Sequence, residues 1–135
     1  MGVFSSLIDI VKQIEREKEM AFLDTVKRAL NNGKIIIVAA EPDNPIEKLL
    51  VLHEKDNKLK SVVTTKKAVI NSIQDSGRDF FTLNTEDIEL TPVYVVDGQN
   101  GEYLRTDREQ DEEEDNLGNL PSILFMKTII KLRIA

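Results

Sequence analysis

Residues 34–40 read Lys-Ile-Ile-Ile-Val-Ala-Ala, a short β-branched run without a helical period. Such a run predicts a β-strand. The next residues, 41–45 (EPDNP), form a loop because two prolines keep them out of any helix. Two more apolar runs, 49–53 and 59–63, flank the turn-forming pair Asp56-Asn57 and predict a β-hairpin. The centre of the chain therefore predicts three strands.

The chain before this strand predicts a long amphipathic helix. Apolar residues recur there at three- and four-residue spacing, Ser5 or Ser6 can cap the first turn, and Asn31-Asn32-Gly33 can end the last one. Residues 15–19 are all charged, so the pattern fits one helix of about 27 residues or two shorter ones. The apolar residues pack on a sheet or on each other, or else the first half, residues 4–14, binds a partner or a second copy. The candidates for partner binding in the first half are Phe4, Leu7, Ile8, Val11 and Ile14.

The chain after the first hairpin predicts a second helix and more strands. Thr64 or Thr65 can cap a helix that Ser76-Gly77 stops, and residues 80–83 predict a strand. Runs at 92–96 and 102–105 flank a Gly-rich turn and predict a second hairpin.

The C-terminal tail fits two structures. Ile130, Leu132 and Ile134 alternate with basic residues, which favours a strand, whereas Ser122 before an apolar run can open a helix. We predict the strand.

This order of elements indicates an α+β fold with a mostly antiparallel small sheet and one further helix between the hairpins. The links within each hairpin are too short for parallel crossovers. We expect an N-terminal helical segment over residues 1–33 and a small α+β domain over residues 34–135.

Composition excludes several classes of function. The 135 residues include no cysteine and one histidine, His53, which excludes disulfides, Cys-ligated zinc and thiol catalysis. The net charge of -6 has the wrong sign for a protein that neutralises phosphates, so we expect no nucleic-acid partner. No catalytic set, cofactor motif or metal-ligand spacing is recognisable.

Hydropathy and the N-terminus point to the cytoplasm. No segment approaches the ~20 apolar residues of a membrane span, so we expect no membrane partner. The first residues also lack the basic start and apolar stretch of a secretory signal.

The acidic run over residues 107–115 (DREQDEEED) has no apolar side chain to offset the free-energy cost of ordering its backbone. We therefore expect an exposed, mobile loop. Calcium binding is an alternative, but the twelve-residue calcium loop with its glycine is absent. The run could also dock on a basic surface such as the C-terminal tail.

Residues 94–121 contain two motifs separated by an acidic stretch: Gly101 with Tyr103-Leu104-Arg105, and Asn116-Leu117 with Asn119-Leu120-Pro121. With these motifs the segment resembles the C-terminal motif of a bacterial and phage family known as domain of unknown function 3892. The family is uncharacterised, so the resemblance implies a domain and no activity.

The motif residues allow two interpretations. Asn116, Asn119 and the planar fork of Arg105 can pin an irregular segment to the backbone. Alternatively, Tyr103, Arg105, Asn116 and Asn119 can recognise a peptide or a carboxylate ligand.

The leading functional hypothesis is a non-enzymatic cytoplasmic module that binds another protein or a second copy, through the N-terminal helix or an open sheet edge. The alternative is a small-ligand or peptide-carboxylate binding protein, which could be an enzyme, built on Arg105 and the Asn116/Asn119 segment.

Overall fold

A computed structural model describes residues 3–42, 45–85, 88–107 and 113–133, and the side chains of those between 16 and 129. It contains helices α1 (Val3–Asn31), α2 (Lys66–Ser76) and α3 (Ile123–Arg133). Its strands are β1 (Ile35–Glu41), β2 (Lys48–Lys55), β3 (Lys58–Thr65), β4 (Phe80–Leu83), β5 (Leu90–Pro92), β6 (Tyr94–Gly98) and β7 (Gly101–Arg105).

The strands form two sheets. Five of them lie in the order β3-β2-β1-β4-β5, and β6 and β7 form a separate hairpin. All pairs are antiparallel except β1 with β4, which run parallel. The α+β class and the mostly antiparallel sheet are therefore confirmed.

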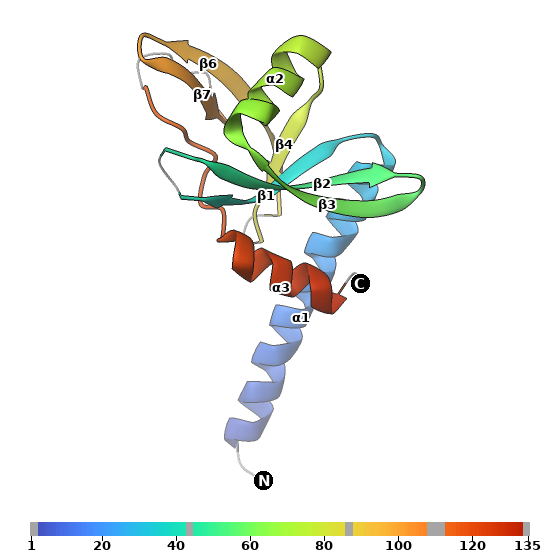
Figure 1. Ribbon diagram of the computed structural model, residues 1–135. Coiled ribbons are helices and arrows are strands. Elements are labelled where there is room, and N and C mark those ends of the chain that lie inside the picture. Colours follow the sequence, from blue (N-terminus) through green and yellow to red (C-terminus); the bar gives the residue numbers. More distant parts are fainter. Residues whose placement is uncertain (1–2, 43–44, 86–87, 108–112, 134–135) are drawn as a thin grey trace.

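The five-stranded sheet lies between two layers (Figure 1). Helices α1 and α3 lie against one face, and α2 and the β6–β7 hairpin lie on the other. The central strand β1 is buried on both faces, which explains why its sequence lacks polar alternation. Ile36 and Val38 face α1, and Ile37 faces α2. A bulge between Ile37 and Ala39 then shifts the register against β2.

Helix α1 is one continuous helix, and the described side chains that pack on the sheet lie in its second half. Among residues 16–31 the buried side chains begin at Phe22 and continue with Val26, Ala29 and Leu30, whereas Met20 is 64% exposed. The first half extends away from the sheet (Figure 1). The second half therefore shares its core with the sheet, and the helix ends at Asn31.

Helix α2 begins and ends as its sequence predicts. The Thr65 hydroxyl oxygen accepts a hydrogen bond from the Ala68 N–H at 3.1 Å. Gly77 has φ +62°, a left-handed conformation that glycine adopts without a Cβ clash.

The predicted C-terminal strand is wrong, because the tail is helix α3. The Ser122 hydroxyl accepts a hydrogen bond from the Phe125 N–H at 3.2 Å, and a Glu41 carboxylate oxygen accepts one from the Ile123 N–H at 2.9 Å. Two of the N–H groups at the helix start are thus satisfied. Ile123 and Met126, three residues apart, are buried on the sheet, which a helix allows and an alternating strand does not.

Strand β5 has no clear signal in the sequence because it has three residues, one of them Pro92. No helix in the described part of the chain is both long enough and apolar enough to cross a membrane.

The packing of α1 predicts two different outcomes of N-terminal truncation. Deleting residues 1–15 should leave a folded protein whose thermal midpoint changes little. Deleting residues 1–33 should abolish cooperative unfolding, because burial of Phe22, Val26 and Leu30 contributes about 6 kcal/mol to the free energy of unfolding. The net stability of a domain is typically only ~5–15 kcal/mol. Circular dichroism melts of both truncations measure this, and a cooperative melt of the longer deletion would contradict it.

Candidate functional site

The family-like motif folds as a strap that runs beside the second hairpin. We call residues 116–121 the strap. Asn116 makes an isolated parallel bridge with Arg105 of β7. Its N–H donates to the Leu104 carbonyl at 2.8 Å, and its own carbonyl accepts from the Thr106 N–H at 2.9 Å. At the other end the Pro121 carbonyl accepts from the Ala40 N–H of β1 at 3.2 Å. The strap therefore ties the hairpin to the central strand.

Asp115, the residue before the strap, is buried and connects three parts of the fold. Its side chain is 0% exposed and lies 3.0 Å from the ammonium nitrogen of Lys66 at the start of α2. It also accepts backbone hydrogen bonds from Ile46, in the β1–β2 connection, at 2.9 Å and from Leu104 at 3.0 Å. A buried carboxylate needs such partners, because leaving it unpaired would cost several kcal/mol.

This burial corrects the expectation for the acidic run. Asp115 as a whole residue, backbone included, is 5% exposed, so the expected exposed loop does not include it. Glu113 accepts hydrogen bonds from the Gln99 N–H and the Asn100 side-chain amide of the β6–β7 turn. Residues 108–112 of the run lie outside the described residues. In the described part of the chain, no group of three or more His, Asp and Glu residues is arranged to hold a metal ion.

Arg105 is buried and its guanidinium already has protein partners. It is 1% exposed, and its Nε and Nη2 donate to the two carboxylate oxygens of Asp107 at 2.6 and 3.1 Å. Its Nη1 donates to the Glu114 carbonyl at 2.8 Å. Both ends of the acidic run are therefore held by one side chain, which is the loop-pinning role.

Tyr103 lies apart from the two asparagines. Its ring is half-buried, and the Lys66 ammonium nitrogen lies 5.6 Å from the ring centroid. A Cβ at Gly98 would lie 2.8 Å from the ring, so a larger residue there would require the ring to shift.

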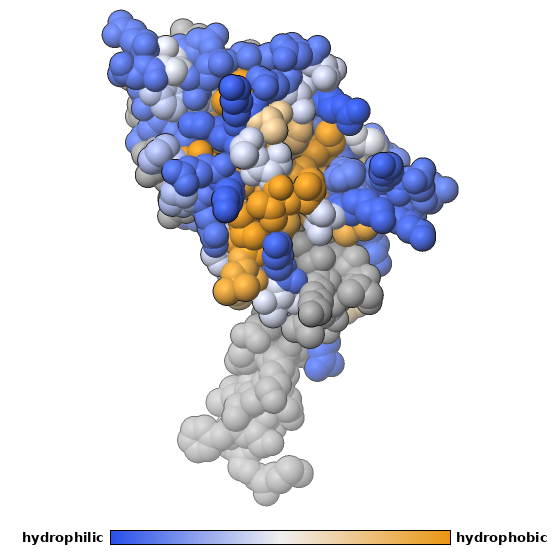
Figure 2. All heavy atoms as spheres, viewed as in Figure 1, coloured by the Kyte–Doolittle hydropathy of each residue, from blue (hydrophilic) through white to orange (hydrophobic). Residues whose placement is uncertain are grey.

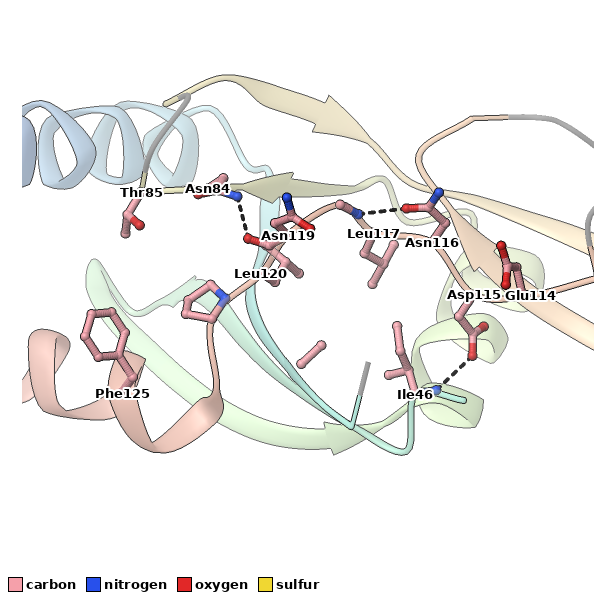
Figure 3. Close-up of a pocket in the computed structure, with 13 residues that line it drawn as sticks. Ile46, Asn84, Thr85, Glu114, Asp115, Asn116, Leu117, Asn119, Leu120 and Phe125 are labelled. Atoms are coloured by element: carbon pink, nitrogen blue, oxygen red, sulfur yellow. Dashed lines mark hydrogen bonds between the residues drawn. The ribbon is translucent and has the colours of Figure 1, made fainter. Parts of the chain in front are cut away.

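A pocket of about 620 Å³ does lie beside the strap (Figure 3). Asn116 and Asn119 line it together with Asn84 and Phe125, whereas Arg105 and Tyr103 do not. The Asn84 side-chain amide donates to the Asn119 carbonyl at 2.5 Å, and the Asn116 side-chain oxygen accepts from the Gly118 N–H at 3.1 Å. The charged residues in the lining are Glu114 and Asp115. Of the four predicted ligand residues, the structure therefore brings two together, in surroundings whose charge has the wrong sign for a carboxylate.

The predicted partner-binding residues of the N-terminal helix lie in the first half of α1. Their backbone is helical, and their side chains lie outside the described residues: Phe4, Leu7, Ile8, Val11 and Ile14.

The sequence hypothesis named an open sheet edge without placing it, and β3 and β5 are the edge strands of the five-stranded sheet. In β3, two valines are partly exposed. Val62 and Val63 are 45% and 39% exposed there. The hairpin could be predicted, but its position at the outside of the sheet could not, because strand order depends on contacts between distant segments.

The comparison with family models gives one match. The model described as "Protein of unknown function (DUF3892)" matches residues 24–121 of the 135. The chain belongs to the DUF3892 family. The suspected membership is thereby confirmed, and the match extends from the packed half of α1 to Pro121 at the end of the strap. No curated protein and no solved structure matches the chain.

The contacts of Asp115 predict that the Asp115→Ala variant will be strongly destabilised. It removes an ion pair and leaves two backbone N–H groups without an acceptor, which should cost about 3 kcal/mol or more. Urea unfolding measures the change. The control is Asp97→Ala on β6, an exposed aspartate, which should change stability by less than about 0.5 kcal/mol. Equal effects of the two substitutions would contradict the role assigned to Asp115.

Proposed function

We propose that this DUF3892 protein is a non-enzymatic cytoplasmic protein-interaction module, and that it binds an extended segment of a partner along the edge of β3. The observation that carries the proposal is the unprotected second half of this edge strand. β3 is eight residues long and pairs with β2 in a continuous register, so no bulge interrupts it. The backbone groups on its outer side can therefore add another strand.

Charged side chains discourage the pairing of a further strand only along the first half of β3. Lysines at 58 and 60 are the usual means of discouraging edge pairing. From Ser61 to Thr65 the strand has no charge, and its two consecutive valines project to opposite faces of the sheet. The opposite edge, β5, has three residues and a proline, so it is protected in the usual way.

Apolar surface also extends beyond the strand. Leu124 and Phe125 of α3 are 75% and 54% exposed. Figure 2 shows apolar surface across the middle of the molecule, over the region where Figure 1 places β3 and the first turn of α3. A partner strand that pairs with β3 would contact apolar side chains on both faces of the extended sheet.

A random peptide library displayed on phage tests this proposal directly. Selection on the immobilised full chain should enrich peptides with alternating β-branched or aromatic residues and few prolines. Binding of a selected peptide should fall at least fivefold in Val63→Lys, which places a charge on the edge. The matched control, Met20→Lys at a 64% exposed position of α1, should change it less than twofold. Peptide binding to the unaltered chain should slow hydrogen exchange at amides of β3.

Failure to enrich any peptide would contradict the proposal. So would peptides that bind Val63→Lys as tightly as the unaltered chain.

The first half of α1 offers a second surface for a partner. It extends away from the sheet, and its sequence has the apolar stripe of a binding helix (Figure 1). The variant without residues 1–15 separates the two surfaces in the same assay. It should bind the selected peptides unchanged if β3 is the binding element, and lose them if the helix is.

A further inference from the structure

A groove lies between α2 and the sheet, separate from the strap. Its volume is about 430 Å³, which is within the usual size range of small-ligand sites. Its apolar lining comes from four strands and the helix: Ile35, Val51, Val62, Val69 and Phe80. The α2 residues that line it are small at every fourth position, namely Ala68, Ser72 and Ser76. Because these side chains are short, the helix leaves space above the sheet along this side.

The charged side of the groove is cationic. Arg78 and His53 line it, and no lining residue is acidic. Lys60 is the register partner of His53 on β3, so it lies on the same face of the sheet. Within the described part of the chain, neither the Arg78 guanidinium nor the His53 imidazole makes a hydrogen bond or an ion pair. Both can therefore donate to a ligand.

The backbone of Arg78 is fixed next to the groove. The N–H groups of Gly77 and Arg78 both donate to the Ser72 carbonyl, which closes the end of α2. The chain then enters β4 at Phe80, whose ring is buried. Arg78 thus has a fixed backbone on both sides and an exposed side chain, which suits it to recognise an anion at the mouth of the groove.

We propose that this groove binds an apolar monocarboxylate, with its aliphatic chain on the valine and phenylalanine surface and its carboxylate on Arg78 and His53. A planar carboxylate matches the donor fork of an arginine. A single negative charge fits the groove better than a phosphate, because the protein as a whole is acidic, with net charge -6. Val62 and Thr64 of β3 line this groove but Val63 does not, so a substitution at Val63 tests strand addition separately from the groove.

Titration of the full chain with decanoate, followed by amide NMR shifts, tests the proposal. The shifts should saturate below the micelle concentration and centre on amides of Val62, Ala68 and Ser76. Decanol, which has the same chain without the charge, should bind at least tenfold more weakly. Affinity should rise two- to fourfold for each CH₂ between hexanoate and decanoate.

Three variants locate the site. Arg78→Gln should weaken decanoate at least fivefold and leave decanol unchanged, whereas Arg16→Gln on α1 should change neither. Ser76→Leu, at an exposed end of α2, should block the groove and weaken both ligands. Val63→Lys should leave decanoate binding intact, so a failure here is distinguishable from a failure of strand addition.

Several outcomes would overturn the inference. They are shifts that do not saturate or that centre elsewhere, decanol binding as tight as decanoate binding, and an Arg78→Gln variant with unchanged affinity.

Discussion

One buried carboxylate determines how the outer parts of this fold attach to its central sheet. Asp115 accepts hydrogen bonds from the backbone of β7 and of the β1–β2 connection, and it pairs with Lys66 at the start of α2. None of these three segments is adjacent to the others in sequence. Because an unpaired buried charge is costly, the carboxylate is stable there only if all three segments are in place. The carboxylate thus stabilises the arrangement of the hairpin, the strap and α2 on one face of the sheet, beside the apolar cluster that these elements share with it.

The parts of the fold that could be predicted are those whose signals are local. The strand at 34–40, the first hairpin and the caps of α2 depend on residues near one another in sequence, and all three are confirmed. The prediction of a strand for the tail is wrong because alternation over five residues is a weak signal. A cap at Ser122 and a distant acceptor on Glu41 decide in favour of the helix.

The candidate site was harder to predict, because charge in a sequence does not reveal burial. Asp115 is the last of a run of carboxylates and looks the same as its neighbours, yet it alone among the described ones is buried. Arg105 is the arginine within the family motif, but its donors bind Asp107 and the Glu114 carbonyl. Arg78 carries no motif; the sequence places it between the end of α2 and β4, but only the fold shows the groove beside it.

The two ends of the acidic run have a further consequence for engineering. Arg105 holds Asp107 and Glu114, and its backbone bridges to Asn116, so the run leaves and re-enters the fold at neighbouring points. Closing a longer loop between fixed neighbouring ends costs little extra entropy, on the order of 0.6 kcal/mol for each doubling of its length. Residues 108–112 are thus a suitable place to splice in an epitope or a fluorescent reporter, with both anchors left unaltered.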